Sequence, residues 1–148
     1  MHYYSIALDL RGRPCVVVGG GEIATRKVEG LLIAGGNITV ISPEVTHVIE
    51  EHARQKKLRH LKRRYQEGDL NGYFLAFAAT GTPEVDVLMA FEANIEGVLL
   101  NVVDRPVLCG FIAPAVVQHG DLSSATNSVR PAYFGLRSGA RYPPEGTF

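Results

Sequence analysis

Short apolar runs alternate with amphipathic segments along most of the 148-residue chain. The runs are rich in valine, isoleucine and leucine, which is typical of strands that are buried on both faces. The amphipathic segments carry apolar side chains at helical spacing. The predicted strands are 15–18, 37–41, 73–79 and 98–103, with a short edge strand at 58–65. The predicted helices are 22–34, 44–57 and 83–96.

This alternation of strands and helices determines the predicted architecture. Consecutive parallel strands need a helical crossover, and such crossovers cover the faces of a sheet. We therefore expect an α/β fold with an open, mostly parallel sheet and helices on both faces. Two weaker strand patterns follow at 111–117 and 122–126, and the pattern fades after Thr126. This predicts one domain over residues 1–125 and a loose, truncated tail over residues 126–148.

Composition and charge exclude several classes of protein. The chain has 46% hydrophobic and 20% charged residues, and its fifteen basic and fifteen acidic side chains cancel. Its two cysteines cannot form a disulfide framework, no apolar run reaches membrane-spanning length, and the N-terminus lacks the pattern of a signal peptide. We expect a soluble, cytoplasmic protein with no membrane or nucleic-acid partner.

One segment departs from this charge balance. Residues 54–64 contain seven of the fifteen Lys and Arg residues. A stretch of this kind is a solvated face or a landing surface for a polyanionic ligand. Aromatic residues are missing from it, apart from the adjoining Tyr65, which argues against binding of single-stranded nucleic acid.

A glycine-rich turn joins the first predicted strand to the first predicted helix. Residues 19–24 fit the pattern Gly-x-Gly-x-x-Gly/Ala. In this pattern Gly19 permits the tight turn, Gly21 lets the backbone approach a pyrophosphate, and Ala24 keeps helix and strand close. The helix N-terminus offers free amides to the phosphates. We predict a Rossmann-like domain that binds NAD through Gly19, Gly20, Gly21, Glu22, Ile23 and Ala24.

The end of the second predicted strand lacks the usual ribose-binding acid. Ser42 and Pro43 stand where Asp or Glu is expected, and Glu44 comes two positions late. We expect Ser42 and Pro43 to contact the cofactor, with one hydroxyl hydrogen bond from Ser42. No Arg or Lys stands beside them in the sequence to receive a 2′-phosphate, which favours NAD over NADP.

Two later strand ends supply further candidates. Thr80 and Gly81 follow one strand and either contact the cofactor or form a plain turn. Asp104 follows the next strand and is either a general base or a turn residue, and position alone leaves both open. Cys109 is interpreted as a small buried hydrophobe rather than a nucleophile. The five histidines show no metal-ligand spacing, so no metal site is expected.

Several segments together resemble one family. They are 10–13 leading into 16–21, Ala24 with Arg26 and Lys27, 39–43, 78–80, 101–104 and 111–115. Over roughly the first 125 residues, the chain resembles precorrin-2 dehydrogenase, the NAD-binding N-terminal module of siroheme synthases. The most specific part is Asn-Val-Val-Asp at 101–104 followed by Phe-Ile-Ala-Pro-Ala at 111–115.

The resemblance implies an activity and a site. It implies NAD-dependent oxidation of precorrin-2 to sirohydrochlorin in siroheme biosynthesis, with a tetrapyrrole substrate and a homodimer. Some family members also insert ferrous iron. Asp104 matches the family's candidate catalytic aspartate and would accept a proton as hydride leaves for the nicotinamide, or take pyrrole protons during metal insertion. The basic segment 54–64 would then attract the carboxylates of the substrate.

The sequence departs from the family pattern beyond residue 125. Family members carry a Ser/Thr-Gly-Gly-Lys-Ser-Pro-like loop and a long helical tail, whereas residues 125–131 read Ala-Thr-Asn-Ser-Val-Arg-Pro and the chain stops at Phe148. The departure leaves an alternative open, namely a non-catalytic NAD-binding module without the substrate half.

Overall fold

The computed structural model describes residues 2–113, 115–119 and 122–126. The chain divides into two compact units, Met1–Phe111 and Ile112–Phe148, each of which is described by itself. The predicted tail over 126–148 lies outside the described residues except for Thr126.

The first unit is built on a five-stranded parallel sheet. Its spatial order is β3-β2-β1-β4-β5. The strands are β1 (Pro14–Val18), β2 (Asn37–Ile41), β3 (Arg59–Leu61), β4 (Leu75–Ala78) and β5 (Leu99–Val102). Every neighbouring pair is parallel, so the expected parallel sheet is confirmed. The register aligns Val18 of β1 with Ile41 of β2 and with Ala78 of β4, which brings the carboxyl ends of these strands to one edge.

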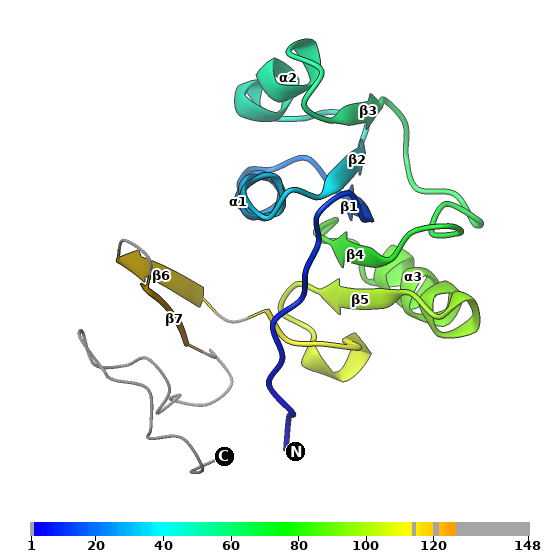
Figure 1. Ribbon diagram of the computed structural model, residues 1–148. Helices are drawn as coiled ribbons and strands as arrows, with labels where there is room; N and C mark the ends of the chain where they lie inside the picture. The colour runs from blue at the N-terminus through cyan, green and yellow to red at the C-terminus, as the bar shows by residue number, and fades with distance from the viewer. Residues whose placement is uncertain (1, 114, 120–121, 127–148) are drawn as a thin grey trace, which may run out of the picture. The chain divides into compact units, whose positions relative to one another are not determined.

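Three α-helices connect the strands. They are α1 (Glu22–Ile33), α2 (His47–Arg54) and α3 (Pro83–Glu96), and a short 3-10 helix, η1 (Pro106–Leu108), follows β5. Figure 1 shows α1 and α2 on one side of the sheet and α3 on the other, as predicted. Val16 and Val18 of β1 pack in one cluster with Met89 and Ala93 of α3. Because strand side chains alternate, Cys15 and Val17 face the side of α1, and both are fully buried.

Several elements are shorter than the sequence pattern predicted, and two of them are much shorter. The helix expected over 44–57 begins only at His47, because Thr46 caps it and accepts a hydrogen bond from the Ile49 amide (3.4 Å). It ends before Lys56, whose φ of 60° lies in the left-handed region. The edge strand expected over 58–65 is only Arg59–Leu61. The chain leaves the sheet there, because Arg63 pairs with Asp69 in the following loop (2.7 Å).

The second unit contributes a pair of antiparallel strands, β6 (Ala115–His119) and β7 (Leu122–Thr126). β7 has the predicted bounds, whereas the strand expected over 111–117 begins four residues later. Phe111 belongs to the first unit, where its ring lies edge-on to that of Phe77, with centroids 5.6 Å apart.

Among the described residues, no helix is both long and apolar enough to cross a bilayer.

Candidate cofactor site

The turn between β1 and α1 is packed against two other loops. Gly19 has a φ of 123°, and a Cβ there would overlap the carbonyl group of Ala79. A Cβ on Gly20 would overlap the carbonyl oxygen of Glu44 and lie 2.9 Å from the hydroxyl of Ser42. The first two glycines are therefore required by the packing of the protein itself.

Gly21 differs from its two neighbours. A Cβ built on it meets no atom within 4 Å, and the residue caps α1 without a side-chain hydrogen bond. The first-turn amides of α1 are consequently open, and they carry the partial positive charge of the helix. Ala24, one turn further on, is fully buried. This combination of open space and free amides fits the pyrophosphate of a dinucleotide.

Two threonines, which the sequence analysis did not select, hold this turn to the next loop. The Thr25 hydroxyl donates to the Gly21 carbonyl (2.9 Å) and shares a hydrogen bond with the Thr46 hydroxyl (2.7 Å). The Thr46 amide donates to the Gly20 carbonyl (2.9 Å). The N-termini of α1 and α2 are therefore joined directly. A threonine at a helix N-cap is a recognisable signal, but its partner in another element is not visible in a sequence.

An open cavity of about 870 Å³ lies at the carboxyl edge of β1, β2 and β4. Predicted site residues that line it are Gly19, Gly20, Gly21, Ser42, Pro43 and Thr80. Other lining residues are Val18, Ile41, Glu44, Val45, Thr46, Arg64, Tyr65, Ala79, Thr82 and Val85.

Ser42 is buried and already hydrogen-bonded in this cavity wall. Its hydroxyl donates to the Glu44 carbonyl (2.6 Å), so its oxygen remains as an acceptor. Its own carbonyl accepts a hydrogen bond from Nε2 of His60 (2.8 Å), and its amide donates to the carbonyl of Leu61 (3.2 Å). These bonds fix the end of β2 against β3.

A second cavity, of about 390 Å³, shares Gly21, Ala79 and Thr80 with the first. It contains the remaining predicted site residues, namely Glu22, Ile23, Ala24, Gly81 and Asp104. Its wall also includes Asp86, which is buried and accepts a hydrogen bond from the Thr80 hydroxyl (3.0 Å). All eleven predicted site residues thus line one of two adjoining cavities. Whether they bind a ligand stays a prediction.

Asp104 is held in a left-handed turn directly after β5. Its φ is 62°, a conformation that aspartate tolerates better than most residues, and its side chain is exposed. The sulfur of Cys109 organises this turn. It accepts a hydrogen bond from the Val102 amide (3.1 Å) and lies 3.3 Å from the carbonyl oxygen of Arg105.

Both cysteines are expected to resist alkylation in the folded protein. Burial raises the pKa of the Cys109 thiol and that of the Cys15 thiol, so the reactive thiolate is suppressed. We expect iodoacetamide at pH 8 to label both at least about tenfold more slowly in the native protein than in urea. Mass spectrometry of the labelled protein measures the rates. Rapid native labelling of Cys109 would instead indicate an accessible nucleophile.

Lys27 adds a positive charge near Asp104. Its ammonium group lies 5.2 Å from the centroid of the Phe77 ring, and the side chain is half-buried. Burial, followed by repulsion from Arg26, lowers the pKa of Lys27, whereas attraction to Asp104 acts in the opposite direction. The sequence analysis included Lys27 only in the family pattern.

A metal site is not formed by the residues for which the structure gives positions. Among these, no three or more His, Cys, Asp or Glu side chains are arranged to hold a metal ion.

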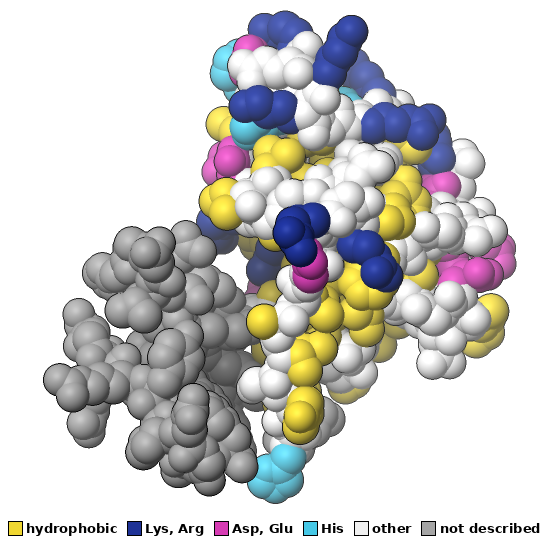
Figure 2. Space-filling view, in the orientation of Figure 1, with side chains coloured by type: hydrophobic (Ala, Val, Ile, Leu, Met, Phe, Trp, Pro, Cys, Tyr) yellow, Lys and Arg dark blue, Asp and Glu magenta, His cyan; other side chains and the backbone are white. Residues whose placement is uncertain are grey.

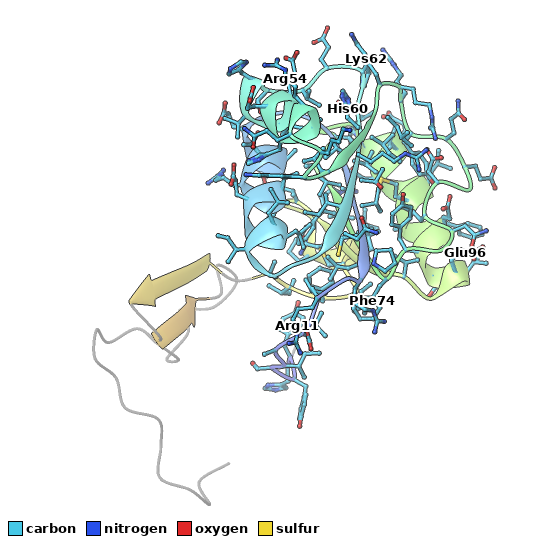
Figure 3. All side chains as sticks on the ribbon, turned by 45° about the horizontal axis from the view of Figure 1, so that its top comes forward. Arg11, Arg54, His60, Lys62, Phe74 and Glu96 are labelled. Atoms are coloured by element: carbon cyan, nitrogen blue, oxygen red, sulfur yellow. The ribbon has the colours of Figure 1, made fainter. Side chains whose placement is uncertain are left out.

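The basic segment lies at the β3 edge of the molecule. Figure 2 shows dark blue side chains gathered there, and Figure 3 labels Arg54, His60 and Lys62 in this region. Two of the basic residues have acidic partners, since Arg54 pairs with Glu51 (2.8 Å) and Arg63 pairs with Asp69 (2.7 Å).

Comparisons with known proteins identify the family of the chain. Residues 6–115 match the family described as putative NAD(P)-binding. The chain is 41% identical over 128 residues to a siroheme synthase of Methylobacillus flagellatus and 38% identical over the same length to one of Photobacterium profundum. These matches cover 86% of this chain, which spans 27% of the length of each relative.

Solved structures give the same result for the fold. The structure titled SirC, precorrin-2 dehydrogenase, superposes with a TM-score of 0.73 and 34% sequence identity, covering 85% of this chain and 62% of that one. The apo structure of D-lactate dehydrogenase from Escherichia coli superposes with a TM-score of 0.52 at 16% identity, which supports the fold alone. The chain therefore belongs to the putative NAD(P)-binding family, the NAD-binding domain that siroheme synthases and precorrin-2 dehydrogenase share.

Proposed function

We propose that this chain binds NAD across the two adjoining cavities and oxidises precorrin-2 to sirohydrochlorin in siroheme biosynthesis. One observation carries the proposal. The predicted proton acceptor, Asp104, lines the same small cavity as Gly21, whose open amide face suits a pyrophosphate. A dinucleotide that crosses the sheet edge from one cavity to the other would bring its nicotinamide end toward Asp104.

The residues of each cavity take separate roles in this proposal. Gly19, Gly20 and Gly21 form the phosphate turn, and Ser42 and Pro43 contact the adenosine ribose. Glu22, Ile23 and Ala24 form the first turn of α1 and would support the cofactor, while Thr80 and Gly81 would contact its nicotinamide half. NAD supplies the hydride acceptor when bound. Overall, precorrin-2 gives up a hydride, which reduces NAD, and a proton, which leaves through Asp104 to solvent.

Local structure supports the role of Asp104. The hydrogen bonds of Cys109 fix the backbone on either side of the turn, so the carboxylate is held at the cavity rim without a side-chain partner from the described residues. Lys27, which is half-buried and attracted to Asp104, places a positive charge near this part of the cavity.

NAD is expected to stabilise the protein against heat. A ligand that binds only the folded state at 100 times its dissociation constant adds about 2.7 kcal/mol of stability. For a chain of this size that is a shift in Tm of roughly 5–10 °C. Differential scanning fluorimetry with and without millimolar NAD measures the shift. Adenosine serves as the control, because it lacks the pyrophosphate that the glycine turn would bind, and an unchanged Tm with NAD would contradict the cofactor site.

An anaerobic assay tests the catalytic proposal. The full chain is mixed with precorrin-2 and NAD, and NADH formation is followed together with the absorbance of sirohydrochlorin. Stoichiometric formation of both products is expected. NAD binding without either product would favour the second candidate function, a non-catalytic NAD-binding module.

The proposal also covers the domain limits of the protein, its oligomeric state, its location and a second substrate. We assign residues 1–125 to the NAD-binding domain and residues 126–148 to a dimerisation and substrate region, in a cytoplasmic homodimer. We also include ferrous iron as a second substrate, since some family members insert it into sirohydrochlorin. An iron-dependent change in sirohydrochlorin absorbance tests this chelatase activity separately.

A further inference from the structure

The end of β2 offers no carboxylate to the ribose. In dinucleotide-binding domains an acid at this point accepts hydrogen bonds from the ribose hydroxyls and repels a 2′-phosphate. Here the first residue after β2 is Ser42, whose hydroxyl oxygen can only accept, since its proton is given to the Glu44 carbonyl. This position therefore lacks the carboxylate that usually repels a 2′-phosphate.

The fold brings a basic side chain to the same place. β2 and β3 run in parallel register, with Ile41 opposite Leu61. Ser42 therefore follows one strand end and Arg64 follows the adjacent one, and both line the larger cavity. The hydrogen bond from His60 to the Ser42 carbonyl ties the two strand ends together (2.8 Å). The sequence places these residues 22 positions apart, so this proximity arises only from strand pairing.

Both neighbours of Arg64 are anchored elsewhere. Arg63 forms two hydrogen bonds with the carboxylate of Asp69 (2.7 and 2.9 Å). Tyr65 donates its hydroxyl proton to the buried carboxylate of Glu92 (2.6 Å). With its two neighbours fixed, the backbone of Arg64 is held at the cavity rim.

The guanidinium of Arg64 is free to bind a ligand. Within the part of the chain that the structure describes, no acidic side chain lies within ion-pair distance of it. The charged residues that line this cavity are Arg64 and Glu44. Around Arg64 the local charge is positive, since Arg59 and Lys62 lie in the same segment without an ion-pair partner among the described residues.

We propose that Arg64, beside the end of β2, forms a site for the 2′-phosphate of NADP, so that the chain binds NADP at least as tightly as NAD. This inference rests on the proposed dinucleotide site but not on the proposed reaction. A guanidinium forms paired, charge-assisted hydrogen bonds with a phosphate. The unphosphorylated ribose of NAD would have only a single hydrogen bond to the Ser42 hydroxyl at this position. Glu44 opposes the effect, because its carboxylate would repel the added phosphate.

Isothermal titration calorimetry of the full chain with NAD and with NADP tests the inference. We expect Arg64→Gln to weaken NADP binding by roughly tenfold or more and NAD binding by less than about threefold. Lys62→Gln is the matched control, since Lys62 belongs to the same basic segment but does not line the cavity. Glu44→Gln should strengthen NADP binding relative to NAD. Competition with 2′,5′-ADP against ADP isolates the contribution of the 2′-phosphate.

Three outcomes would overturn the inference. The wild-type chain could bind NAD but reject NADP, which would leave the proposed function intact. Arg64→Gln and Lys62→Gln could weaken NADP binding equally, which would indicate a diffuse basic surface rather than a site. Binding of neither dinucleotide would remove the cofactor site together with this inference.

Discussion

Replacement of Asp104 by asparagine is expected to lower the rate of precorrin-2 oxidation by roughly 10²–10⁴-fold, the usual contribution of a positioned general base. Asparagine has nearly the same shape as aspartate and also tolerates a positive φ, so the turn after β5 should keep its conformation. Only the capacity to accept a proton is lost. The dissociation constant for NAD should therefore change by less than about twofold, since the phosphate turn is untouched.

Steady-state rates under anaerobic conditions, combined with calorimetric titration of NAD, measure both quantities. Glu96→Gln is the matched control, because it also neutralises an exposed carboxylate but lies at the far end of α3 from the cavities. Equal turnover by the wild-type and Asp104→Asn proteins would remove Asp104 from its catalytic role, whereas loss of NAD binding would show that the residue holds the cofactor.

Replacement of Gly21 by alanine should affect NAD binding, whereas replacement of Gly20 by alanine should affect stability. Gly21→Ala is expected to leave the free energy of unfolding within about 0.5 kcal/mol of wild type, since a Cβ there meets nothing. It should nevertheless weaken NAD binding by roughly tenfold or more, because the new methyl group keeps the pyrophosphate from the backbone. Gly20→Ala should instead destabilise the protein by about 1–3 kcal/mol, because its Cβ would overlap Glu44 and Ser42.

Urea denaturation and NAD titration of both variants provide the measurement. Gly30→Ala serves as a control for the substitution itself, since Gly30 is exposed within α1 and has open space around it. Unchanged NAD affinity in Gly21→Ala would contradict the placement of the pyrophosphate on this turn. An unaltered stability in Gly20→Ala would contradict the close contact between the turn and the 42–44 loop.

The sequence predicts the elements best where one local signal determines them. β2 and α3 have the predicted bounds, since apolar patterning, a proline in the first turn of α3 and Gly97 at its end all agree. α2 is shorter than predicted because the segment before His47 is held by hydrogen bonds to Gly20 and Thr25, which periodicity does not report.

The candidate site was likewise predictable from the sequence only where a local motif identifies its residues. The glycine turn and Asp104 could be found from motifs, because spacing within one segment identifies them. Arg64 and Asp86 could not, since each lines a cavity beside a residue of another element. Thr25 could not either, since its bond to Thr46 joins two helices that are separate in the sequence. Arg64 also changes the argument about the cofactor. The sequence has no basic residue beside Ser42, whereas strand pairing brings one into the same cavity.

The hydrogen bonds that join the glycine turn to the Ser42–Thr46 loop have a consequence for how a dinucleotide enters. The walls of the larger cavity are held in place by the protein's own contacts, between Gly20 and Thr46, Thr25 and Thr46, and Ser42 and Glu44. A preorganised pocket of this kind loses little conformational entropy on binding, so more of the interaction energy is retained as affinity. Association should then follow diffusional encounter, with the residence time setting the differences in affinity between one nucleotide and another.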